Sequence, residues 1–184
     1  MRFSKKSLIA LSAFILSFVF VPASHAQLNS AVSTVTLNAP LAESLTLTGV
    51  TAAVTFALPP TGSVNGNLPV GVTTSWVLAK TRTTSVKLYA YFTTGNALTD
   101  AAGTNIPVAN VSGNVNGTGA TPFTGVTPFS GATGITVFTQ PLTVAGPFNS
   151  SHGPDSIVLT ITTTGLALPA GTYTGTLNLQ AQAI

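Results

Sequence analysis

The residue types of a hydrolase triad occur within one short segment, Ser-Ser-His-Gly-Pro-Asp, at residues 150–155. A serine nucleophile, a histidine base and an orienting aspartate would perform acyl transfer if they met in space. Neighbouring side chains of an extended segment point in different directions, so adjacency in sequence does not build that geometry. We therefore predict no catalytic residue among Ser150, Ser151, His152 and Asp155. We expect a turn in which Asp155 and the serines cap backbone donors before a strand begins at Ile157.

The chain contains few residues that could bind a metal or perform other kinds of catalysis. There is no cysteine, and residues 27–184 contain a single histidine and three acidic residues. Preformed zinc and calcium sites need more ligands of those types than this. No carboxylate pair suggests glycoside hydrolysis, and no glycine loop connects a strand to a helix to hold phosphate. The sequence predicts a protein that is not an enzyme and that holds no metal or cofactor.

The first 26 residues have the pattern of a secretory signal peptide. Arg2, Lys5 and Lys6 precede an apolar run from residue 8 to residue 21, and Ser24 and Ala26 present small side chains for cleavage. The run is shorter than the ~20 residues that span a membrane. We expect cleavage after Ala26, no membrane span in the remaining chain, and a location in the periplasm, outside the cell or at the cell surface.

Beyond the signal peptide, the formal charges balance. The positive residues are Lys80, Arg82 and Lys87, and the negative ones are Glu43, Asp100 and Asp155. Nucleic-acid binding depends on a clustered basic face that neutralises phosphates, and three dispersed cations do not form one. We therefore predict no nucleic-acid partner.

The elements that must position any site are strands, because apolar residues recur at every second position. Clear examples are Val86, Leu88, Ala90 and Phe92 on one face of a strand, with Lys87, Tyr89 and Tyr91 on the other. The same alternation occurs at residues 35–39, 45–47, 54–58, 76–78, 135–137, 157–161 and 173–183. Many short strands separated by Gly and Pro turns predict an all-β, two-layer antiparallel sandwich of about eight strands. Residues 27–184 form one domain in this reading, with Trp76 in the core.

One region, residues 112–134, departs from the strand pattern. It is rich in Gly, Ser, Thr and Asn, and it contains the near-repeat Thr-Pro-Phe-Thr-Gly-Val and Thr-Pro-Phe-Ser-Gly-Ala. We expect a long loop here, and two fates remain open for Phe123 and Phe129. They either fasten the loop to the sandwich or join Tyr89 and Tyr91 in an aromatic surface that binds a carbohydrate or a protein.

The carboxyl-terminal stretch, Leu-Pro-Ala-Gly-Thr-Tyr-Thr-Gly-Thr-Leu-Asn-Leu-Gln-Ala-Gln-Ala-Ile, carries the clearest motif. Its turn, Pro169, Ala170, Gly171, Thr172 and Tyr173, leads into a long alternating strand. This motif resembles the closing strand of spore coat protein U-like domains and archaic chaperone–usher fimbrial subunits. The resemblance implies an immunoglobulin-like sandwich that lacks one strand, which a periplasmic chaperone and then a neighbouring subunit supply by β-strand addition.

The resemblance also implies a donor strand near the amino terminus. Residues 27–42 would be that extension, with Val35, Leu37 and Ala39 on its apolar face. We therefore expect a secreted, non-enzymatic structural or cell-surface subunit whose partners are copies of itself and a chaperone and usher. The alternative is a self-contained β-sandwich module that binds a carbohydrate or a protein and pairs its first strand within its own sheet. The alternation suits an internal and an external acceptor equally well.

Overall fold

The computed structural model describes residues 33–80 and 84–184. The predicted signal peptide lies outside these residues, as does the first part of the predicted donor extension. The chain divides into residues 1–39 and residues 40–184, and each part is described by itself. Residues 33–39 form no strand, and the side chains of Val35 and Leu37 are 81% and 90% exposed.

Residues 40–184 are all-β, as the sequence predicts. The described strands are β1 (Ser44–Thr48), β2 (Ser63–Asn65), β3 (Val70–Val77), β4 (Ser85–Tyr91), β5 (Asn96–Thr99), β6 (Asn105–Pro107), β7 (Val111–Val115), β8 (Ala120–Pro122), β9 (Ile135–Pro141), β10 (Asn149–Thr162) and β11 (Asn178–Ala183). A 3₁₀ turn, η1 (Val108–Asn110), lies between β6 and β7. These strands outnumber the eight expected because several short pairings lack a recognisable alternation.

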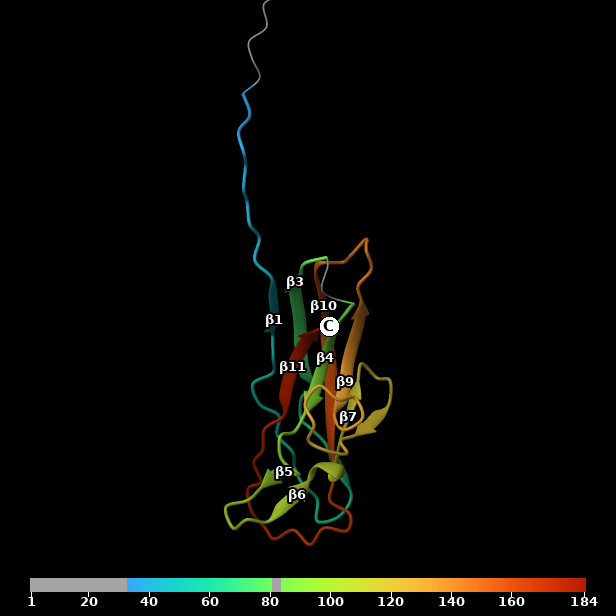
Figure 1. Cartoon of the computed structure of the whole chain (residues 1–184). Coiled ribbons are helices and arrows are strands. Elements are labelled where there is room, and N and C mark those ends of the chain that lie inside the picture. Colours follow the sequence, from blue (N-terminus) through green and yellow to red (C-terminus); the bar gives the residue numbers. More distant parts are fainter. Residues whose placement is uncertain (1–32, 81–83) are drawn as a thin grey trace, which may run out of the picture. The chain divides into compact units, whose positions relative to one another are not determined.

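Two antiparallel sheets carry most of the structure (Figure 1). The larger has the order β1-β3-β10-β7-β8, with β2 also paired to β10, and the smaller has the order β11-β4-β9. β5 and β6 form a separate two-stranded sheet. β1 and β11 are edge strands of different sheets and lie close to each other without pairing.

The core lies between the two larger sheets and contains residues of both. Trp76 of β3 is buried there, as predicted, and its ring stacks on Phe138 of β9 at a centroid distance of 6.4 Å. The indole nitrogen donates a hydrogen bond to the carbonyl oxygen of Pro147, 3.0 Å away, so burying it leaves no unpaired donor. Each large apolar side chain buried in this way contributes roughly 1.5–3 kcal/mol.

The expected long loop at residues 112–134 begins instead as a hairpin. β7 and β8 pair across residues 116–119, where Asn116 and Gly117 both have positive φ angles, 50° and 79°. Asn-Gly is the strongest short hairpin signal because both residues tolerate that conformation. The high Gly and Thr content of the region obscured this signal. The loop proper is therefore confined to residues 123–134.

Phe123 should be the main attachment of that loop to the core. Its side chain is fully buried and meets the ring of Phe92 edge-on at a centroid distance of 4.9 Å. Replacing Phe123 with alanine should lower the free energy of unfolding by about 3–5 kcal/mol, because the buried ring would leave a cavity. Val144→Ala, at a fully exposed loop position, should change it by less than about 0.5 kcal/mol. Urea denaturation measures both, and equal effects would contradict the assignment.

Candidate functional site

An open groove of about 900 Å³ penetrates the sandwich beside the β1 and β11 edges. Two segments, residues 50–58 and 171–177, form its lips, and neither is assigned to a strand. The floor is apolar and includes Val70, Val111, Leu159 and Ile161. None of the lining residues carries a charge.

The first lip is a segment whose alternation predicted a strand. Val54, Phe56 and Leu58 are half-buried along the groove, but the segment has no strand partner on that side. Thr55 faces the other way: its N–H donates to Asn67 Oδ1 at 2.8 Å, and its carbonyl accepts from the Asn67 N–H at 2.9 Å. Backbone groups of an extended chain alternate in direction. Those of Val54 and Phe56 therefore point toward the groove, and they have no backbone partner within the described residues.

The second lip follows the predicted carboxyl-terminal turn. Thr174 exchanges two backbone hydrogen bonds with Thr99 of β5, at 2.8 and 3.0 Å. By the same alternation, the backbone groups of Tyr173 and Gly175 face the groove, and the described chain gives them no backbone partner. Gly175 packs so closely on β5 that an added Cβ would lie 1.8 Å from the carbonyl oxygen of Ala97.

The predicted strand over residues 173–183 is thus divided. Its second half is β11, which pairs with β4, while its first half is the lip. Pro169, Ala170, Gly171 and Thr172 are exposed at the start of the lip, and the Tyr173 hydroxyl donates to the Pro169 carbonyl oxygen at 2.9 Å. Partial desolvation, followed by the nearby Asp100 carboxylate, raises the pKa of the Tyr173 phenol.

The groove lies beside β11, whose side chains are less buried than those of the neighbouring strand. Leu179 of β11 is only half-buried, whereas Leu88 of the neighbouring strand β4 is fully buried. An extended segment placed between the lips could bond to both of them through its backbone and bury alternate side chains on the floor. The arrangement is suited to binding a strand, and it places no reactive group at the floor.

The aromatic residues considered for partner binding lie elsewhere and are largely covered. Tyr89 and Tyr91 are only 5% and 7% exposed, and Phe123 is fully buried. Phe129, from the loop, covers the outer face of β4, with ring centroids 5.9 Å from Tyr89 and 6.4 Å from Tyr91. The Tyr91 hydroxyl also donates to Gln180 Oε1 at 2.6 Å. In this conformation these rings offer little surface to a ligand.

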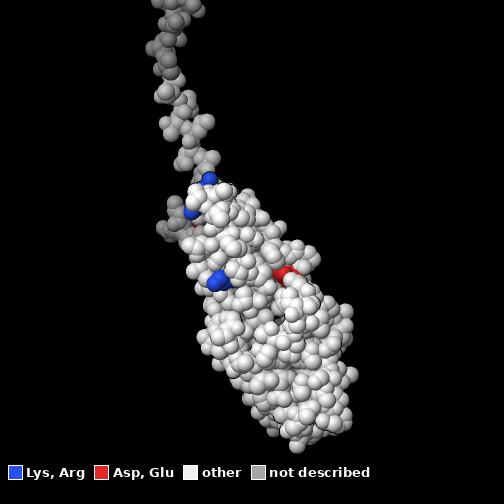
Figure 2. Space-filling view, turned by 90° about the vertical axis from the view of Figure 1, so that its right-hand side faces the viewer, with Lys and Arg blue, Asp and Glu red and all other residues white. Residues whose placement is uncertain are grey.

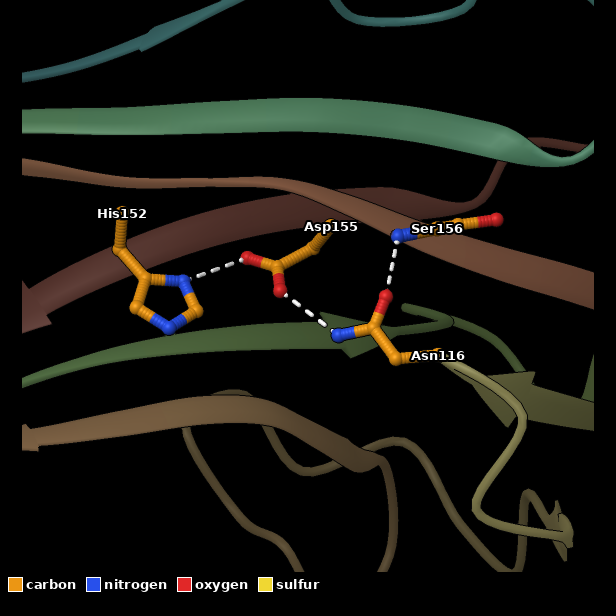
Figure 3. A network of polar contacts seen from close by, with 4 residues as sticks. All are labelled: Asn116, His152, Asp155 and Ser156. Atoms are coloured by element: carbon orange, nitrogen blue, oxygen red, sulfur yellow. Dashed lines mark hydrogen bonds and ion pairs between the residues drawn. The ribbon is translucent and has the colours of Figure 1, made fainter.

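The hydrolase-like segment is part of β10, and the expected capping turn is wrong (Figure 3). His152 Nδ1 lies 3.0 Å from Asp155 Oδ2, and Asn116 Nδ2 donates to Asp155 Oδ1 at 2.9 Å. Among the described residues neither Ser150 nor Ser151 forms a hydrogen bond to His152, so these four residues do not adopt the triad geometry. Residues 33–80 and 84–184 also contain no cluster of three or more metal-ligating side chains.

The rest of the surface has little charge, as one face shows in Figure 2. In the described part of the chain, no helix has the length and apolar character required to cross a membrane. Comparison of the chain with protein-family models, curated protein sequences and solved structures finds no match.

The close packing of Gly175 gives a test of how the second lip is held. Gly175→Ala should lower the free energy of unfolding by about 1–3 kcal/mol, because the new methyl group would overlap the Ala97 carbonyl and push the lip off β5. Gly95→Ala is a matched control, since no atom lies within 4 Å of an added Cβ there. Urea denaturation of the two variants compares them directly. Equal stability would mean that the lip is not held against β5.

Proposed function

We propose that the protein is a secreted, non-enzymatic structural or cell-surface subunit that assembles by strand complementation. In this proposal its immunoglobulin-like sandwich lacks one strand, and the groove accepts that strand from another copy. The observation that carries the proposal is the pair of lips, Val54 and Phe56 on one side and Tyr173 and Gly175 on the other. Both carry backbone groups that have no backbone partner among residues 33–80 and 84–184, and the side chains between them are apolar.

The donor we propose is residues 33–41 of a second copy. Val35, Leu37, Ala39 and Leu41 alternate along it, and the side chains at 35, 37 and 41 are strongly exposed. Leu41 extends the pattern recognised in the sequence by one further position. The segment has as many residues as the lip at 50–58, so the two extended lengths match.

The absence of charge in both the proposed donor and the groove supports the same pairing. Residues 27–42 contain no charged side chain, and neither does the lining of the groove. An uncharged strand entering this groove therefore loses no ionic hydration, whereas a charged one would pay a desolvation penalty. The balanced charge of residues 27–184 also limits repulsion between copies. A periplasmic chaperone that occupies the groove before assembly is consistent with the predicted signal peptide.

The alternative function, a self-contained carbohydrate- or protein-binding module, has less support. It relied on Tyr89, Tyr91, Phe123 and Phe129 as a contact surface, and the first three are almost completely buried. It also relied on the first alternating segment pairing within its own sheet, and residues 33–39 form no strand.

Assembly can be tested with a pair of neighbouring substitutions in the donor. Residues 27–184 are exported to a periplasm and examined on an unboiled denaturing gel. The unaltered chain should give a ladder of multimers that collapses on boiling. Leu37→Asp should abolish the ladder, because it places a carboxylate on the apolar floor. Asn38→Asp adds the same charge on the opposite face of the donor and should leave the ladder intact. A ladder that survives Leu37→Asp, or a monomer band from the unaltered chain, would refute the proposal.

The acceptor can be tested in the same way with a synthetic peptide of residues 30–42. Added to the Leu37→Asp monomer at a hundredfold excess over its Kd, the peptide should stabilise the fold by about 2.7 kcal/mol, measured by thermal denaturation. Val54→Asp should remove this stabilisation because its side chain lines the groove. Ala57→Asp, at an exposed position of the same segment that does not line the groove, should retain it. Stabilisation of both variants would place the peptide outside the groove.

A further inference from the structure

β10 changes its pairing register on β3 in the middle of its length. His152 lies opposite Thr74, and Asp155 lies opposite Val72. Two residues separate the pair on β10, whereas one residue separates their partners on β3. β10 therefore carries one extra residue at this point, which is a β-bulge.

The bulge reverses which residues of β10 face the core. Before it the even-numbered residues Ser150 and His152 lie opposite the buried Trp76 and Thr74. After it the odd-numbered residues Ile157, Leu159 and Ile161 are buried. The second half of β10 has an apolar pattern that specifies its register, because a one-residue slip would expose these three side chains. The first half, residues 149–152, reads Asn-Ser-Ser-His and contains no apolar residue that could do the same.

A polar network lies at the bulge (Figure 3). The Asp155 carboxylate is 1% exposed and has partners on both sides. His152 Nδ1, from the polar half of β10, lies 3.0 Å from one oxygen, and Asn116 Nδ2, beyond the end of β7, donates to the other at 2.9 Å. Asn116 Oδ1 in turn accepts the N–H of Ser156 at 2.8 Å. A buried carboxylate is costly without such partners, so the network favours the one register that supplies them.

Two further contacts restrict the same point. The His152 ring stacks on Phe138 of β9 at a centroid distance of 4.1 Å, which connects the polar half of β10 to the opposite sheet. Gly153 has a φ of 112°, and an added Cβ would lie 2.8 Å from the Val72 carbonyl oxygen. Only glycine allows β10 to approach β3 this closely at the extra residue.

We propose that Asn116, His152 and Asp155 form a register lock that fixes the polar half of β10 against β3. In the second half of β10 the apolar pattern specifies the pairing register on β3. In the first half the register lock does so. Without it the segment 149–152 slips by one residue, which turns Asn149 and Ser151 toward the core and Ser150 and His152 toward solvent. The slip also removes the stack of His152 on Phe138. These three are positioning residues, and the lock operates whatever the groove binds.

The absence of cysteine from the chain permits a direct test with single-cysteine reporters. Ser150→Cys and Ser151→Cys change one atom each and sit on opposite faces of the locked strand. With the lock intact, a thiol reagent should modify position 151 faster than position 150. Adding Asp155→Ala should reverse this order, slowing position 151 and accelerating position 150. We expect the ratio of the two rates to change by about tenfold or more, since hydrogen bonds to a charged group are lost.

The direction of change at position 151 distinguishes a slip from simple destabilisation. Loss of stability alone would accelerate both positions or leave 151 unchanged, and that result would overturn the proposal. Asp100→Ala is the matched control, because that carboxylate also accepts two hydrogen bonds, from the N–H groups of Ala102 and Thr104, away from the lock. It should preserve the original order. If Asp155→Ala does not fold, Asn116→Ala in the same two reporters decides the question by the same criterion.

Discussion

The main physical constraint on the groove is that backbone groups along its two lips have no backbone partner within the described residues. A backbone N–H or C=O that is shielded from water without a partner costs roughly 1–3 kcal/mol. Val54, Phe56, Tyr173 and Gly175 can satisfy these groups with water only while the groove stays open. The open groove also leaves apolar side chains along its edges only half-buried, among them Val54, Phe56 and Leu179. An extended segment bound between the lips would meet both conditions, because it would cover these side chains and supply backbone partners.

Both lips are held from behind, so the groove keeps its form without an occupant. Thr55 is fastened to Asn67 by two hydrogen bonds, and Thr174 is fastened to Thr99 by two more. At Gly175 the backbone of the second lip packs directly against the backbone of β5, with no room for a Cβ atom between them. A segment that binds therefore meets preformed edges, and little of its binding free energy is spent on ordering them.

Apolar residues at every second position indicate that one face of a strand is buried. They do not indicate whether the same chain or another chain covers that face. For β3, β4 and the second half of β10 the partner strand lies in the same chain, so the prediction of a strand is confirmed. Residues 54–58 and 173–177 show the same alternation and form no strand. Their open sides face the groove, and the described residues hold no partner there. The Asn116-Gly117 pair marks the turn of the β7–β8 hairpin, but the surrounding Gly-rich sequence has no strand alternation that would indicate the two short strands. The contact of His152 with Asp155 could not be predicted, because it depends on a bulge that no local pattern announces.

The two ends of the sandwich differ in how their core side chains are covered. At one end the Phe138 ring stacks on Trp76 and on His152, and the buried Asp155 carboxylate has hydrogen-bond partners on both sides, so the core is closed by the chain itself. This closure uses polar partners, which are specific in direction and tolerate one register only. At the other end the floor is apolar and uncharged, and apolar contact is not directional. Specificity there must come from the backbone edges and from the spacing of alternate side chains. The closed end is thus defined by polar contacts within the chain, and strand binding between copies, as proposed above, would use the open end.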